Sequence, residues 1–343
     1  MYKLKYLLVL LLPIVIYVSF QQGGWWNFFP IIFVFGIVPL FDIVFPASTE
    51  NKSDEEYEAL KKDKTFDYLL YLMVFTQYAF MFYFFFTFKN SDTTIIEKIG
   101  MTISAGLMCG VLGINVAHEL GHRATKLEQF FAKALLLTSL YTHFFIEHNR
   151  GHHKNVSTDD DPASSKLGEW VYSFWFRSMI FGYFSAWELE KERLERKNLP
   201  IVSWHNEMIR FQVYQLLAIV AVALIFNWQT ALAFVGAALV GGLLLETVNY
   251  IEHYGLRREK NERDRYEKVQ PHHSWNSNHI VGRLLLFELS RHSDHHYIAN
   301  RKYQTLRHFD QSPQMPTGYP GMMVLSLIPP LWFLLMNKRV KNI

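Results

Sequence analysis

Cysteine is almost missing from this sequence, because Cys109 is the single example and lies inside an apolar run. One cysteine cannot form an internal disulfide, and it excludes a four-cysteine zinc or iron–sulfur site. A strong charge of either sign is also missing, since the formal net charge is only +3 over 343 residues. No nucleic-acid partner is expected, because nucleic-acid-binding domains carry a pronounced basic patch.

Apolar residues, by contrast, make up 50% of the chain and aromatic residues 16%, which indicates a membrane protein. Six apolar runs approach the roughly 20 residues that cross a bilayer core. They cover residues 5–20, 27–45, 67–88, 95–117, 209–227 and 230–250. The first run has the lysine flank of a secretory signal, but no small-x-small cleavage pattern follows it. We therefore interpret it as a membrane helix and expect one membrane-embedded catalytic domain over residues 1–343.

Three further apolar runs are shorter or interrupted, at 129–146, 170–187 and 322–336, and Pro329 and Pro330 break the last one. Such runs are typical of helices that lie at the membrane interface, although a seventh or eighth span stays open as an alternative. The expected fold is thus an all-α integral membrane protein with six transmembrane helices and additional interfacial helices.

Lysine and arginine are unevenly shared among the loops, and this bias predicts the orientation. The connections near 21–26 and 228–229 have neither residue, whereas the 46–66 loop has four lysines. The polar regions 118–208 and 251–343 are rich in both residues. Because positive loops favour the cytoplasmic side, we expect both termini and both polar regions in the cytoplasm, on a chain embedded in the cell inner membrane.

Histidine is the unusual residue, with 15 copies, and most of them lie in spaced groups within the two polar regions. His118 and His122 are four residues apart, a spacing that places both rings on one face of a helix. Two more groups show the same spacing, and a further histidine directly follows the sixth apolar run. The nine candidate metal ligands are His118, His122, His148, His152, His153, His253, His292, His295 and His296.

The number of rings indicates two metal ions, because one zinc ion needs only three or four ligands. Imidazole suits iron, copper, zinc and nickel, so the rings alone leave the metal open. Carboxylate-bridged di-iron bundles need two Glu-x-x-His pairs, and only Glu119 with His122 has this form. We expect a mostly nitrogen-ligated di-iron pair, with carboxylates that accept the spare N–H of ligand rings. The candidate carboxylates are Glu119, Glu147, Asp161, Glu252 and Asp294.

A competing interpretation starts from His118-Glu-Leu-Gly-His122, which matches the zinc-protease pattern H-E-x-x-H. Glu119 would then act as a general base on a zinc-bound water. This alternative leaves seven other clustered histidines without a role. For the carboxylates, the alternative is an ordinary solvated acidic surface.

The motifs resemble those of the integral membrane alkane 1-monooxygenases, within the wider group of membrane desaturases and hydroxylases that share three histidine boxes. The strings that carry the resemblance are GIVPLFD at 36–42, FFIEHNRGHH at 144–153, NYIEHYGL at 249–256, PHHSWNSNH at 271–279, RHSDHH at 291–296 and GYPGMMVLSLIPP near the C-terminus. One departure is Arg123, where lysine is usual in the family. The resemblance covers most of the chain.

This resemblance implies a non-haem di-iron enzyme that uses O₂ to hydroxylate the terminal methyl group of n-alkanes to 1-alkanols. It carries the iron ligands onto the eight box histidines and makes His253 the ninth. It also implies electrons from NAD(P)H, delivered by a reductase and a rubredoxin or ferredoxin, and the single cysteine suggests a separate donor protein. The alternative is a membrane acyl desaturase or another lipid hydroxylase. The string NYIEHYGL and the histidine within it argue against this alternative.

Two finer expectations concern substrate and donor. In the family, a bulky side chain on the second span limits how deep an alkane can enter. Val34 lies at the corresponding position in this sequence, and its small side chain favours longer alkanes. Phe33 or Phe35 could close the tunnel instead. Basic residues beside the first two boxes predict a docking surface for an acidic electron carrier. The alternative is that they only reflect the excess of lysine and arginine on the cytoplasmic side of membrane proteins. These residues are Arg123, Lys126, Arg150 and Lys154. No ligand role is expected for His143, His205, His272, His273, His279 or His308.

Overall fold

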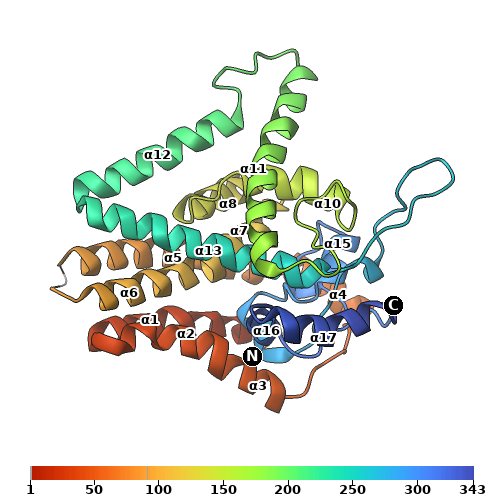
Figure 1. The fold of residues 1–343 in the computed structure, drawn as a ribbon, viewed down its shortest axis with the longest axis horizontal. Coiled ribbons are helices and arrows are strands. Elements are labelled where there is room, and N and C mark those ends of the chain that lie inside the picture. Colours follow the sequence, from red (N-terminus) through yellow and green to blue (C-terminus); the bar gives the residue numbers. More distant parts are fainter. Residues whose placement is uncertain (1, 91) are drawn as a thin grey trace.

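The computed structural model describes residues 2–90 and 92–343 (Figure 1). This part of the chain is helical, with no strand beyond two isolated β-bridges. Six helical stretches are long and apolar enough to cross a membrane, which confirms the predicted fold class and number of spans. They are Lys3–Gln22, Gly24–Val44, Thr65–Asn90, Ile95–Gly121, Glu207–Ile225 and Trp228–His253.

Three spans are single helices, and three consist of consecutive segments. The single helices are α5 (Thr65–Asn90), α12 (Glu207–Ile225) and α13 (Trp228–His253). The first span consists of η1 (Tyr2–Leu10) and α1 (Leu11–Gln22), the second of η2 (Gly24–Phe28), α2 (Phe29–Ile32), η3 (Phe33–Ile37) and α3 (Val38–Val44), and the fourth of α6 (Ile95–Met108), η4 (Cys109–Ile114) and α7 (Asn115–Gly121).

The polar regions contain shorter helices that carry or surround the histidines. Between the spans lie α4 (Asp54–Lys62), α8 (Lys126–Thr138), α9 (Phe144–Ile146), η5 (Glu147–His152), α10 (His153–Asn155) and α11 (Val171–Glu195). After the sixth span follow η6 (Pro271–His273), α14 (Ile280–Leu285), α15 (His292–Tyr297), η7 (Tyr303–Thr305), α16 (Tyr319–Ser326) and α17 (Pro329–Val340).

The three interrupted apolar runs do not form single long spans. The run at 129–146 breaks after α8, where Leu140 has a positive φ of 47°. The run at 322–336 forms α16 and α17. The chain bends by 119° between these two helices, because a proline pair starts the second one. The chain therefore has six candidate spans, or seven if this bent pair crosses the membrane as one.

The fourth and sixth spans approach each other closely because glycines face their neighbours. A Cβ on Gly106 would lie 2.4 Å from the Cβ of Val240, and a Cβ on Gly241 would lie 2.6 Å from the Cβ of Cys109. Small residues that let helix backbones approach are a common device of membrane helix packing. This contact brings the ends of α7 and α13, which carry His118 and His253, to the same place.

The histidine-bearing helices gather at one end of the bundle (Figure 1). Both chain termini lie toward this end, whereas the α1–η2 and α12–α13 connections lie at the opposite end. The two connections without lysine or arginine thus lie at the end opposite to the histidine-bearing helices.

Candidate metal centre

The nine predicted histidines come together in two adjacent groups, one of five rings and one of four. Within each group, one ring nitrogen from every residue lies within 4.8 Å of the others. The first group is His118, His122, His148, His153 and His295, and the second is His152, His253, His292 and His296. The groups touch, because the ring centroids of His153 and His296 are 4.5 Å apart.

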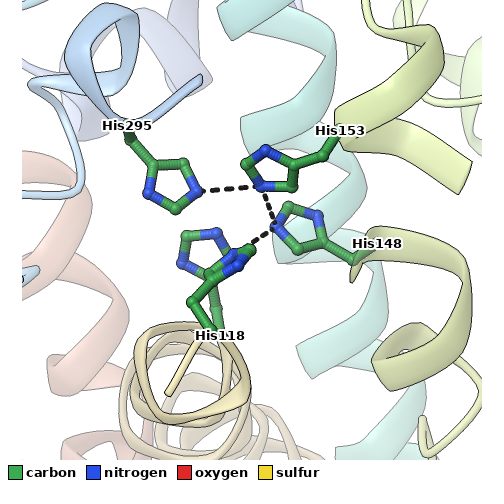
Figure 2. A group of neighbouring side chains, drawn as sticks. His118, His148, His153 and His295 are labelled. Carbon is green, nitrogen blue, oxygen red and sulfur yellow. Dashed lines mark hydrogen bonds between the residues drawn. The ribbon is translucent and has the colours of Figure 1, made fainter. Parts of the chain in front are cut away.

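The first group is assembled by α7, the η5–α10 segment and α15 (Figure 2). The Nε2 atom of His148 lies 3.1 Å from that of His122 and 3.0 Å from that of His153. The Nε2 atom of His295 lies 3.1 Å from that of His153. The rings therefore point their Nε2 atoms toward a common centre, as ligands of one metal ion would.

The second group lies deeper, and all four of its rings are buried. The Nε2 atoms of His253 and His292 are 3.3 Å apart. The ring centroid of His296 lies 4.8 Å from that of His152 and 5.0 Å from that of His253. His253 is the last residue of α13, so the sixth span itself delivers a ring to this group.

A π-helix decides how the second box is divided. The four-residue spacing predicts that His148 and His152 share a face, but the structure places them in different groups. The reason is that η5 is a π-helix, in which each hydrogen bond spans five residues instead of four. Residues four and five apart then both lie beside one another, and His148 contacts His153 as well as His152. The predicted shared face is present, because the rings of His148 and His152 stack with their centroids 5.2 Å apart, but the two residues enter different groups.

The buried rings fit metal ions better than they fit a packed core. Both ring nitrogens of His296 have no hydrogen-bond partner among the described residues. An unsatisfied buried polar group costs roughly 1–3 kcal/mol, and facing Nε2 atoms need a shared cation or proton to avoid repulsion. A metal ion at each centre would satisfy the inward-facing nitrogens, so the residues present suit two ions.

The protonation state of the rings supports this interpretation. Burial is the main cause of a pKa of about 3 for His122, and the positive charge of Arg123 adds to it. Burial and neighbouring imidazoles also hold the pKa values of five other rings well below the ordinary range. These rings are His148, His153, His292, His295 and His296. Neutral imidazole is the form that binds a metal ion.

Asp161 occupies the place expected of a carboxylate that orients a ligand ring. Its Oδ2 atom lies 2.9 Å from Nδ1 of His152, which leaves Nε2 for the metal. The hydroxyl of Ser164 and the backbone N–H of Ala163 donate to the same carboxylate and hold it in place. Burial opposes a proton on His152, but the charge of Asp161 outweighs it and raises the pKa of this histidine.

Glu252 lies on the other side of its partner ring. Its Oε2 atom is 3.1 Å from Nε2 of His292, the nitrogen that also faces His253. A carboxylate that only orients the ring would contact Nδ1 instead. This position allows Glu252 to offer an oxygen to the second metal ion or to a water molecule beside it.

Among the described residues, the other three candidate carboxylates form no hydrogen bond or ion pair with a ligand ring. Glu119 is paired with Arg123 and accepts the backbone N–H of Tyr303 at 3.2 Å. Asp294 is paired with Arg301 and Arg307.

Glu147 is fully enclosed, and its Oε1 atom has no partner among the described residues. Burial, with a smaller contribution from the charge of Asp161, raises the pKa of Glu147 to about 8. This carboxyl group is therefore largely protonated at neutral pH in the metal-free protein.

An apolar cavity connects the second span with the two histidine groups. Its wall includes Val34 and Phe35 on η3, and it ends at the rings of His118, His148 and His292. Phe33 is not part of this wall. The cavity thus brings Val34 and the histidine centre into one largely apolar space.

Two amides at the inner end of this cavity were missed by sequence reasoning. Asn115 and Asn249 line the wall beside the histidine rings. Asn115 precedes His118 by three residues on the same helical face, so its spacing was an available signal. All three π-helices in residues 2–90 and 92–343, η3, η4 and η5, also contribute to the wall. Their positions had no such signal in the sequence.

The predicted docking surface is only partly available. Arg123 is 7% exposed and pairs with Glu119 and Asp67, so its predicted role as a docking residue is wrong. Arg150 also forms internal ion pairs, at 3.0 Å with Glu190 and 3.2 Å with Glu207. Burial of a charge requires such partners, and the sequence does not reveal them. Lys126 and Lys154 are exposed.

None of the six remaining histidines joins the two groups. His143 is buried against Tyr141, His279 contacts Ser277, and His308 contacts Asn278. His205 is exposed. His272 and His273 lie together with Glu267 in a separate cluster.

Comparisons with known proteins agree with the geometry. Residues 99–325 match the fatty acid desaturase family. The chain is 40% identical to alkane 1-monooxygenase 2 of Alcanivorax borkumensis, over 98% of this chain and 88% of that relative. It is 41% identical to alkane 1-monooxygenase 1 of Pseudomonas aeruginosa, over 93% of this chain and 84% of that relative. It is also 40% identical to the alkane 1-monooxygenase of Acinetobacter baylyi, over 89% of this chain and 74% of that relative.

These similarities extend through the histidine groups and overturn the zinc-protease interpretation, which had relied on five residues. They also favour a hydroxylase over the acyl-desaturase alternative. A multi-pass chain with nine converging histidines, joined by an apolar cavity to the second span, is what the sequence resemblance led us to expect. The chain belongs to the alkane 1-monooxygenases, within the fatty acid desaturase family.

Proposed function

We propose that this protein hydroxylates the terminal methyl group of n-alkanes to give 1-alkanols, with O₂ as the oxygen source and two electrons from a separate donor. The observation that carries the proposal is the apolar cavity, which leads from η3 to the rings of His118, His148 and His292. A narrow apolar path with ligand rings at its inner end presents an alkane end-on. Terminal selectivity then follows from reach and orientation.

The nine histidines would hold two iron ions, five rings on one side and four on the other, with Glu252 beside the second group. The bound iron pair would supply the activation of O₂, because no side chain of the chain can do this redox chemistry. Imidazole ligands are compatible with iron, and family membership makes iron our choice among the metals they suit. The protein itself binds the alkane, orients its methyl group and keeps water away.

The lysine distribution supports a position in the cell inner membrane with both termini and the metal centre at the cytoplasmic face. In this orientation the alkane enters from the lipid, because Val34 and Phe35 line the cavity from within a membrane span. Electrons reach the centre from the aqueous side. Substrate and electrons therefore use separate routes.

The two histidine groups differ in their exposure to solvent, and the more exposed first group is the favoured entry point for electrons. His122 and His153 in the first group are half-buried, whereas all rings of the second group are buried. A surface cleft that contains Lys61 and Lys64 ends at His122. An acidic rubredoxin or ferredoxin, reduced by its NAD(P)H reductase, would find its shortest route to the metal here.

A charge-reversal experiment tests this docking site. The double variant Lys61→Glu and Lys64→Glu is expected to raise the KM for the electron carrier by about tenfold at low salt, because a favourable encounter becomes repulsive. High salt should reduce the difference by screening. Steady-state oxidation rates at varied carrier concentration measure the effect.

The matched control reverses Arg196 and Lys197, which are exposed at the end of α11. An equal rise in KM for this control, or none for the cleft variant, would show that the carrier binds elsewhere.

A second experiment concerns the length of the substrate. Val34→Trp places an indole ring in the cavity wall, and we expect the longest accepted alkane to become shorter by several carbons. Leu40→Trp is the control, because Leu40 lies on the same span and is 62% exposed on its outer surface. Gas chromatography of products from a mixture of alkanes measures the range. An unchanged product range for Val34→Trp would mean that the alkane follows another path.

The proposed reaction itself is tested by supplying the purified holoenzyme with an n-alkane, labelled O₂ and a reconstituted rubredoxin system. Mass spectrometry should find one labelled oxygen atom in the 1-alkanol. Alcohols at internal carbons would contradict the terminal selectivity, and unsaturated products would reassign the enzyme as a desaturase.

A further inference from the structure

A third cluster of metal-binding side chains lies outside the nine-histidine centre. It consists of Glu267, His272 and His273, whose nearest ligand atoms all lie within 4.8 Å of one another. The three residues belong to the segment between α13 and α14, part of which projects from the molecule as a loop (Figure 1). Neither the histidine boxes nor the apolar cavity includes any of the three residues.

The backbone holds the ring of His273 beside Glu267. The backbone N–H of Gln270 donates to Nδ1 of His273 at 2.9 Å, so this nitrogen is an acceptor and Nε2 faces Glu267. The distance from Nε2 to Oε1 of Glu267 is 3.1 Å. Two ligands of a tetrahedral ion with bonds of roughly 2.0–2.1 Å are separated by about 3.3 Å. Little movement is needed to admit an ion between them.

His272 supplies the third ligand. Its ring centroid is 4.1 Å from that of His273, and its ring makes no hydrogen bond to any described residue. The ring is half-buried and can turn toward the shared space without breaking an interaction. Two imidazoles and one carboxylate are a ligand set that zinc and similar divalent ions accept, with water in the fourth position.

The geometry points to a third metal site in this protein, formed by Glu267, His272 and His273, that binds a zinc-like divalent cation and anchors the loop. On binding, the proton of His273 moves from Nε2 to Nδ1, so that Nε2 ligates the ion as a neutral imidazole and Nδ1 gives up the hydrogen bond from Gln270. The oxidation state of the ion does not change. The site is structural and separate from the chemistry of the nine histidines.

The contacts around the cluster explain what an ion here would stabilise. The hydroxyl of Ser157 donates to the backbone oxygen of His273 at 2.7 Å, and the backbone N–H of Trp275 donates to the oxygen of Glu252 at 2.8 Å. The first contact ties the loop to the segment after the second box, and the second ties it to the end of α13. An ion would therefore hold the loop against two ligand-bearing segments.

Metal binding tests the site directly. Iron-loaded protein is incubated with Zn²⁺, freed of unbound metal, and analysed for zinc and iron by mass spectrometry. Wild type is expected to keep its iron and to retain about one zinc ion per chain. His272→Ala and the conservative variant Glu267→Gln should retain iron but lose the zinc. His205→Ala, which changes an exposed histidine outside the cluster, should bind zinc as wild type does.

Limited proteolysis provides a second readout. Arg263, Arg265 and Lys268 are exposed trypsin sites on the same loop. Saturating Zn²⁺ should slow cleavage there by roughly tenfold or more in wild type, because the ion favours the closed loop, and should have no effect in the two cluster variants. The site does not exist if wild type retains no zinc, or if the cluster variants retain as much as wild type does.

Discussion

Replacing His253 by alanine is expected to remove one of the two metal ions and to lower alkane hydroxylation at least about 100-fold. Loss of an outer carboxylate alone costs roughly 10–100-fold, so loss of a direct ligand should cost more. His253 is one of only four rings in the second group, and all of its neighbours there are buried. At this depth, solvent cannot supply a ligand in place of the lost ring, and the three remaining rings hold the ion poorly.

Metal analysis distinguishes this result from general unfolding. The His253→Ala protein should carry about one iron ion per chain instead of about two, because the group of five rings is intact. His205→Ala should keep both iron ions and full activity. If His253→Ala retained both ions and its activity, the assignment of this ninth ligand would be wrong.

Removing the carboxylate of Asp161 is expected to have the second largest effect. Asp161→Ala takes away the acceptor that lies 2.9 Å from Nδ1 of His152, so the ring can turn and its Nε2 leaves the second group. The expected loss is about 10–100-fold in metal affinity or activity. Competition with a chelator, followed by iron analysis, measures the affinity.

Two matched variants separate orientation from folding. Asp161→Asn keeps an oxygen that can accept the N–H of His152 and should recover much of the affinity. Asp160→Ala changes the exposed neighbour and should behave as wild type. If Asp161→Asn and Asp161→Ala were equally impaired, charge would matter instead of orientation. If neither were impaired, the contact would have no part in metal binding.

The spans and the set of histidines could be predicted from the sequence because both have local signals. A run of apolar residues long enough for a bilayer has few other structures available to it, and the observed spans differ from the predicted ones mainly at their ends. The boxes were recognised because repeated spacings of three and four place side chains on one face of a helix.

The division into five and four rings could not be predicted, because it depends on features without a local signal. His148 is paired with His153 by the π-helix η5, and ordinary helical spacing pairs it with His152 instead. Glu119 belongs to an ion pair with Arg123, although its place in the first box suggested a role at the metal. Only the tertiary structure shows which residue forms the ion pair with a buried charge.

The carboxylates that contact the ligand rings also depend on the tertiary structure. Asp161 lies eight residues after His153 in a loop, and the turn that brings it back to His152 depends on Ser164 and Ala163. Glu252 directly precedes His253, yet it contacts His292 from a distant helix. Adjacency in sequence was a useful guide to which carboxylates matter, but not to which ring each one contacts.

The most direct test of the account is the ratio of iron to protein in the purified enzyme, followed together with 1-alkanol formation while metal is removed and restored. We expect about two iron ions per chain, a loss of activity in step with the loss of iron, and recovery with Fe²⁺ but not with Zn²⁺. One zinc ion per chain in place of the iron, or full hydroxylation after the iron has been removed, would contradict the proposed di-iron centre.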